Sequence, residues 1–154
     1  MIISLEDWVF DVDLEATATY SRQELAENCR CAYCRNFYEA IDRYYPQLRT
    51  FLTQFGLELN APDRMSPIDY DPGRTDYDPR YVVFGQILQM GTYELSVGLA
   101  NICPSAIEDL IDGKPAFLLD VYEVSLPWIL DESFPGGIPQ KKTRDSWLTR
   151  LLNS

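Results

Sequence analysis

Apolar and polar positions alternate over Trp8–Val12, with Trp, Phe and Val at every second residue. A period of two is typical of a strand with one buried face, so we predict a strand there. The alternation continues to Tyr20, but Asp13 could equally cap a helix that follows the strand. Both interpretations stay open. Ser21–Glu24 then has the spacing of a capping box and predicts a short helix that ends near Asn28.

Farther along, apolar residues recur at steps of three and four, which places them on one face of a helix. The residues with this spacing are Phe37, Ile41, Tyr44, Leu48, Leu52 and Phe55. Pro46 interrupts the series, because proline disfavours a helical conformation in the residue before it. We therefore predict one helix over Arg35–Tyr45 and a second over Pro46–Phe55, closed by Gly56.

The second half of the chain is richer in strand signals. The prolines and aspartates of Asn60–Arg80 predict a surface loop. Tyr81–Met90 and Thr92–Ala100 are rich in β-branched and aromatic residues and lie close enough in sequence for a β-hairpin. Ser105–Glu108 has capping-box spacing and predicts one or two helical turns. Ala116–Leu126 predicts another strand, which Pro127 ends.

Helices in the first part and strands in the second favour an α+β fold with an antiparallel sheet. We expect a helical hairpin packed against that sheet in two layers, in a single domain over residues 1–154. The length of 154 residues is ordinary for one domain. A last helix is predicted at the C-terminus, with Trp147, Leu148, Leu151 and Leu152 on one face.

The chain is acidic, with 13 Lys and Arg against 24 Asp and Glu and a formal net charge of −11. Such a charge repels nucleic acid and anionic lipid and attracts basic partners. Histidine is absent, which excludes Ser-His-Asp and Cys-His catalysis and imidazole metal ligands. The composition therefore favours a non-enzymatic protein that binds neither nucleic acid nor a membrane. The N-terminus does not resemble a signal peptide, so the cytoplasm is expected.

Cysteines cluster at the entrance to the predicted helix, where Cys29, Cys31 and Cys34 fall within six residues. One interpretation is a structural zinc site, because zinc takes four tetrahedral ligands and a Cys-x-x-Cys step often supplies two of them. Cys103, at a predicted strand end, is then the candidate fourth ligand. We expect no cofactor unless this interpretation holds, in which case the cofactor is zinc.

Two other interpretations of the cysteines stay open. Cys31 and Cys34 form a Cys-x-x-Cys dithiol, and a helix N-terminus beside Arg30 and Arg35 lowers the pKa of a thiol, as in thiol redox proteins. Alternatively, the three thiols pack as small apolar side chains where the helix meets the sheet.

An acidic, tyrosine-containing segment occurs twice in the predicted loop, as Asp-Tyr-Asp-Pro at 69–72 and again at 76–79. Tyrosine is enriched at protein interfaces, and surrounding charge steers a partner of opposite sign. We expect a basic protein to bind here, as in an immunity-type inhibitor of a basic toxin. The candidate binding residues are Asp69, Tyr70, Asp71, Asp76, Tyr77 and Asp78.

The cysteine motif, Cys-x-Cys-x-Tyr-Cys-x-Asn-Phe over Cys29–Phe37, follows an acidic strand at Asp7–Asp13. Together they resemble a family of small, acidic, uncharacterised bacterial proteins. Segments at Leu52–Leu57, Tyr81–Gly85 and Leu126–Asp131 extend the resemblance over most of the chain. The resemblance implies a bacterial, cytosolic setting and no particular activity. Cys103 is not part of the motif.

Overall fold

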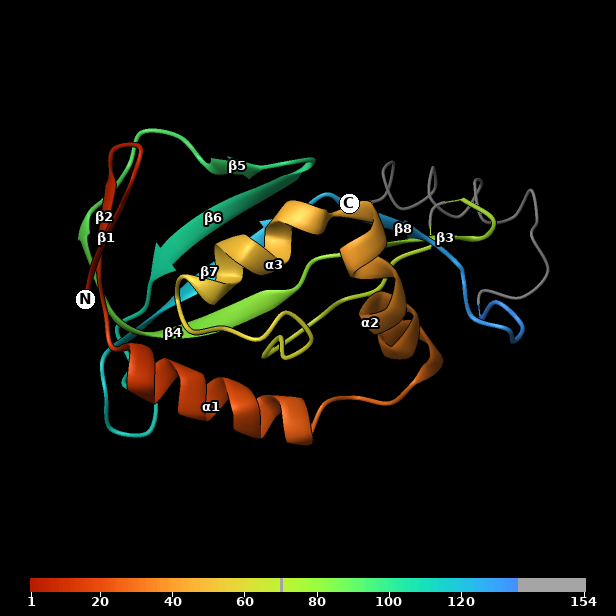
Figure 1. The fold of residues 1–154 in the computed structure, drawn as a ribbon, viewed down its shortest axis with the longest axis horizontal. Helices are drawn as coiled ribbons and strands as arrows, with labels where there is room; N and C mark the ends of the chain where they lie inside the picture. Colours follow the sequence, from red (N-terminus) through yellow and green to blue (C-terminus); the bar gives the residue numbers. More distant parts are fainter. Residues whose placement is uncertain (70, 136–154) are drawn as a thin grey trace, which may run out of the picture.

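The computed structural model describes residues 1–69 and 71–135, which form an α+β fold of three helices and a curled antiparallel sheet (Figure 1). The helices are α1 (Leu14–Ala26), α2 (Ala32–Tyr44) and α3 (Pro46–Thr53). The sheet has six strands in the order β1 (Ile2–Leu5), β2 (Trp8–Val12), β4 (Arg80–Gln89), β7 (Ala116–Tyr122), β6 (Ala100–Ala106) and β5 (Leu95–Val97). A separate two-stranded sheet pairs β3 (Arg74–Tyr77) with β8 (Val124–Pro127). The predicted fold class is confirmed.

Helices α2 and α3 bury their apolar faces in one core, in which α2 contacts β8 of the two-stranded sheet and α3 contacts β5 of the six-stranded sheet. Phe37, Ile41, Leu48 and Leu52 are fully buried, as the helical spacing predicts, whereas Tyr44 of the same series is exposed. Phe10 of β2 stands at the centre of the core, with its ring centroid 5.4 Å from that of Phe55 and 5.3 Å from that of Phe117. Each such aromatic side chain contributes about 1.5–3 kcal/mol of hydrophobic stabilisation, so this contact anchors the helices to the sheet.

The N-terminal predictions are confirmed in part. The strand over Trp8–Val12 is β2. Asp13 caps the following helix, because its Oδ1 accepts a 3.0 Å hydrogen bond from the Ala16 N–H. The predicted helix start at Ser21 is wrong: Ser21 lies inside α1, and its hydroxyl instead accepts a 2.8 Å hydrogen bond from the Glu58 N–H.

The two helices on either side of Pro46 are confirmed as α2 and α3. Tyr45 joins them with φ −133°, outside the helical region, as expected for a residue that precedes proline. Their arrangement as a hairpin stays a prediction.

The second half differs more from expectation. β4 pairs with β2 and β7 rather than with the strand that follows it, so the predicted hairpin of Tyr81–Met90 with Thr92–Ala100 is wrong. The Ser105–Glu108 helix is also wrong, because β6 runs through Ala106 and pairs with β7. Long-range pairing outweighs the local capping signal there.

Two smaller differences remain, and one prediction is untested. The strand over Ala116–Leu126 is broken at Glu123, whose φ of +64° separates β7 from β8. The loop over Asn60–Arg80 contains β3. The predicted C-terminal helix, Trp147 to Leu152, lies outside the described residues. Within the described ranges, no helix has both the length and the apolar character needed to cross a membrane.

Candidate metal centre

Helix α2 begins at a cysteine. Cys31 is its N-cap residue, with extended backbone angles, and the Cys31 sulfur accepts the N–H of Cys34 over 3.5 Å. The Cys31 carbonyl accepts the N–H of Arg35 over 2.9 Å. The cap therefore holds the Cys31 sulfur over the first turn of α2.

Three sulfur atoms meet at this helix start. The Sγ atoms of Cys29, Cys31 and Cys34, here called the cysteine cluster, all lie within 4.8 Å of one another. Cys29 and Cys31 are exposed, whereas Cys34 is 8% exposed. In a tetrahedral zinc site with bonds of about 2.3 Å, sulfur ligands lie about 3.8 Å apart. Small side-chain rotations would therefore bring the three sulfurs onto one ion.

The loop that carries Cys29 is tied to α2 by two hydrogen bonds. The Tyr38 hydroxyl donates to the Cys29 carbonyl over 3.0 Å. The Arg35 Nε donates to the Arg30 carbonyl over 2.9 Å. Because both donors lie on the helix that carries Cys34, these bonds hold the cluster together before any ligand arrives.

The thiols of the cluster differ in acidity. Hydrogen bonding from the Cys31 backbone, and then from the Cys31 and Cys34 thiols, lowers the pKa of Cys29. Burial raises the pKa of Cys34, and its hydrogen bonds to the other two thiols act in the same direction. Burial also raises the pKa of Tyr38, reinforced by the neighbouring cysteines. Cys29 is therefore a stronger acid than Cys34.

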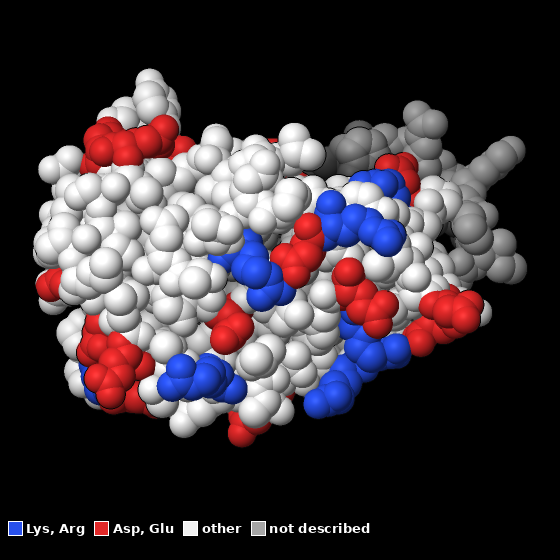
Figure 2. All heavy atoms as spheres, in the orientation of Figure 1, with Lys and Arg blue, Asp and Glu red and all other residues white. Residues whose placement is uncertain are grey.

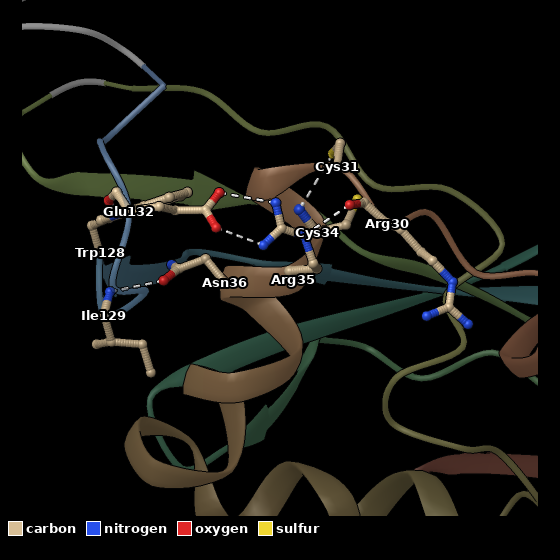
Figure 3. A network of polar contacts seen from close by, with 8 residues as sticks. All are labelled: Arg30, Cys31, Cys34, Arg35, Asn36, Trp128, Ile129 and Glu132. Carbon is tan, nitrogen blue, oxygen red and sulfur yellow. Dashed lines mark hydrogen bonds and ion pairs between the residues drawn. The ribbon is translucent and has the colours of Figure 1, made fainter.

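The side chains of the two arginines beside the cluster, Arg30 and Arg35, are directed away from the sulfur atoms drawn in Figure 3. Arg35 makes a bidentate pair with Glu132, with N···O distances of 2.8 and 2.9 Å. The Arg30 side chain extends away from the sulfurs of Cys31 and Cys34 (Figure 3). The thiol redox interpretation expected a lowered thiol pKa in the Cys31 and Cys34 pair, but burial raises the pKa of Cys34.

A second set of contacts fastens α2 to the segment after β8. The fully buried Asn36 donates from Nδ2 to the Pro127 carbonyl over 3.1 Å and accepts the Ile129 N–H at Oδ1 over 2.8 Å (Figure 3). The indole N–H of Trp128 donates to the Glu132 carbonyl over 2.8 Å. These contacts fix the first turns of α2, on which the cluster depends.

Cys103 is not part of the cluster. It lies within β6, opposite Asp120 of β7, and does not belong to the group of sulfurs that approach within 4.8 Å. Burial, with Glu94 and Asp120 nearby, raises its pKa. The predicted four-cysteine site is therefore wrong in its fourth ligand. The interpretation of all three clustered thiols as buried packing groups fits only Cys34.

The predicted binding segment divides into exposed and structural residues. Tyr77 is fully buried and donates a 2.7 Å hydrogen bond to the Tyr33 carbonyl, so its predicted place in an interface is wrong. Asp69 is half-buried and accepts hydrogen bonds from the hydroxyls of Tyr33 and Thr75. Asp71 and Asp78 are exposed, and Tyr70 lies outside the described residues.

Asp76 and Asp78 line a groove of about 390 Å³ that the sequence did not predict. The other lining residues are Ile68, Glu94, Tyr122 and Glu123, and this set is here called the acidic groove. Partial burial in the groove raises the pKa of both aspartates, and at Asp78 the nearby carboxylates of Asp76 and Asp120 act in the same direction. On the face that Figure 2 presents, Lys and Arg lie among Asp and Glu.

Sequence reasoning identified the three cysteines but missed the residues that position them. Tyr38 lies four residues after Cys34, a spacing that puts both on one face of a helix and could have indicated the contact. Glu132 and Asn36 carried no such signal, because their partners are distant in sequence. Comparisons with protein-family models, with curated proteins and with solved structures found no match for this chain.

Proposed function

We propose that this protein binds a thiophilic metal ion, zinc in the first place, through Cys29, Cys31 and Cys34. The observation that carries the proposal is the approach of three sulfur atoms to within 4.8 Å of one another. Thiolates are soft ligands that favour Zn²⁺ and Cu(I) over Mg²⁺ and Ca²⁺. The thiols must stay reduced for this, as they do in the cytoplasm.

The arrangement resembles an open metal site more than a closed structural one. Structural zinc takes four protein ligands, whereas the cluster in the described part of the chain offers three. Solvent or another molecule would supply the fourth ligand from the side where Cys29 and Cys31 are exposed. Three thiolates on Zn²⁺ carry one net negative charge, which the N-terminus of α2 stabilises.

The test is a zinc titration of the reduced, chelator-treated chain against a chromophoric competitor. We expect one tight site per chain. Replacing Cys29, Cys31 or Cys34 by Ser should each weaken zinc binding by more than about a hundredfold, because each substitution removes a ligand. Cys103→Ser is the matched control and should bind as the unaltered chain does. The proposal is contradicted if the unaltered chain binds no zinc. It is also contradicted if Cys103→Ser weakens zinc binding as much as the substitutions of Cys29, Cys31 and Cys34 do.

A second candidate function is the binding of a basic protein at the acidic groove. Four carboxylates, from Asp76, Asp78, Glu94 and Glu123, line one concave surface beside Tyr122. Such a surface favours a lysine- or arginine-rich segment and steers its approach.

A short lysine-rich peptide is the probe for this candidate. The double variant Asp78→Asn with Glu94→Gln should weaken peptide binding about tenfold at low salt. The control Glu108→Gln with Asp109→Asn makes the same change in charge at exposed positions outside the groove. Equal losses in both double variants would show that only the net charge matters and would contradict a specific groove.

A further inference from the structure

The cysteine cluster combines an exposed thiol with a buried thiol one helical turn away. Cys31 is exposed at the N-cap of α2, and Cys34 is buried in the first turn, with its N–H directed to the Cys31 sulfur over 3.5 Å. Both thiols are free. The two residues therefore form a dithiol in which the Cys31 thiol is exposed to solvent and the Cys34 thiol is buried beside it.

We propose that hydroperoxides oxidise Cys31 and Cys34 to a disulfide, and that this modification switches off metal binding at the cluster. The switching part of this inference rests on the proposed function, whereas the disulfide itself does not.

Cys31 and Cys34 are the N-cap residue and a first-turn residue of the same helix, so α2 fixes the separation of their backbones. The two sulfurs lie within 4.8 Å, and a disulfide needs about 2.05 Å between them, a gap that side-chain rotation in neighbouring turns can close. The Cys31 backbone is extended, with φ −65° and ψ 162°, so its side chain is free of the helical constraint. Cys29 lies in the loop before α2, and its sulfur meets the same 4.8 Å limit.

The reaction proceeds in two balanced steps. The Cys31 thiolate attacks the outer oxygen of the hydroperoxide, the O–O bond breaks, and the alcohol leaves with a proton while Cys31 becomes a sulfenic acid. The Cys34 sulfur then attacks the Cys31 sulfur, and the sulfenic oxygen leaves as water. The two thiols lose two electrons, which the hydroperoxide takes up.

Oxidation and metal binding exclude each other because they use the same atoms. A disulfide removes two of the three sulfur ligands and leaves Cys29 alone, which cannot hold zinc tightly. Bound zinc occupies both sulfurs and therefore slows their reaction with the oxidant.

The test exposes the full chain, reduced and metal-free, to one equivalent of hydrogen peroxide and counts free thiols. We expect the four cysteines to fall to two, with a mass loss of about 2 Da per chain as a disulfide forms. Cys29→Ser and Cys103→Ser should still lose two thiols. The double variant Cys29→Ser with Cys34→Ser, which has no second thiol in the cluster, should form no disulfide within the chain and should instead retain a Cys31 sulfenic acid that a 1,3-diketone probe traps.

Zinc is then added to the oxidised chain, and in a separate arm before the oxidant. We expect the oxidised chain to bind zinc more than about a hundredfold more weakly, and preloaded zinc to slow thiol loss at least about tenfold. A disulfide that contains Cys29 or Cys103, or no thiol loss, overturns the inference whether or not zinc binds. A Cys31–Cys34 disulfide in a chain whose reduced form never binds zinc overturns the switching and the proposed function together, and supports the oxidation chemistry.

Discussion

The Tyr38 hydroxyl donates a 3.0 Å hydrogen bond to the carbonyl oxygen of Cys29. This bond ties the loop between α1 and α2 to the second turn of α2, one turn after Cys34. The separation between the Cys29 and Cys34 sulfurs is therefore set by a contact outside the sulfur atoms themselves. Metal binding at the cluster should depend on residues that never touch the ion.

Removing the Tyr38 hydroxyl should loosen the cluster without removing a ligand. We expect Tyr38→Phe to cost about 0.5–1.5 kcal/mol of unfolding free energy in the metal-free protein, the usual worth of one hydrogen bond. Zinc affinity should fall several-fold, because the loop that carries Cys29 is then less ordered in the metal-free protein and the entropy cost of ordering it is paid when the metal binds. Urea unfolding and zinc competition measure the two effects. Tyr44→Phe makes the same change at an exposed position of the same helix and should leave zinc affinity unaltered.

Asn36 should matter more for the fold than any charged residue near the cluster. Asn36→Ala leaves the Pro127 carbonyl and the Ile129 N–H without their partner in a buried site. We expect a loss of about 2–4 kcal/mol, because each unsatisfied buried group costs about 1–3 kcal/mol. Asn101, whose amide bonds Glu123 at the surface, provides the control. An Asn101→Ala loss as large as that of Asn36→Ala would contradict this account.

Alkaline pH should destabilise the fold through buried tyrosines. Burial raises the pKa of Tyr77 to about 12, whereas an unfolded tyrosine ionises near pH 10. The stabilisation is therefore complete below pH ~10 and is lost as the pH rises toward 12, by about 2–3 kcal/mol for this group. Urea unfolding at about pH 8 and about pH 11 measures the loss. Tyr77→Phe should reduce the pH dependence, and an unchanged dependence in that variant would assign the effect to other groups.

Gly85 should tolerate no side chain. It lies in β4 with φ +137°, and a Cβ atom there would fall 2.0 Å from the Asp11 carbonyl oxygen of the neighbouring strand. We expect Gly85→Ala to cost more than about 3 kcal/mol, because the β2–β4 pairing must open to admit the methyl group. Gly73 also has positive φ, at +74°, but nothing lies within 4 Å of its Cβ position. Gly73→Ala should therefore cost only about 1 kcal/mol, and similar urea midpoints for the two variants would contradict the steric explanation.

Local signals predicted the parts of the fold that depend on neighbouring residues. The alternation over Trp8–Val12 identified β2, and Pro46 identified the boundary between α2 and α3. The same reasoning failed where distant segments pair. Ser105–Glu108 has a helical cap signal, yet Ser105 belongs to β6, where it pairs with Leu118 of β7.

The sequence predicted the three clustered cysteines of the candidate site but not the residues that position them. Three cysteines within six residues had to lie near one another whatever the fold, so the cluster followed from the sequence. The expectation that Cys103 joins them had no local basis, and the sheet places it on β6. Tyr77 looked like a surface residue because aspartates flank it, but in β3 its side chain points to the opposite face from theirs, into the core.

X-ray absorption at the zinc edge of the reduced, zinc-loaded chain tests the central claim most directly, because it counts the sulfur atoms on the ion. We expect three sulfurs at about 2.3 Å and one lighter atom at about 2.0 Å. Cys31→Ser should lower the sulfur count to two. A first shell of oxygen or nitrogen alone, or a sulfur count that Cys31→Ser leaves unchanged, would contradict metal binding by the cysteine cluster.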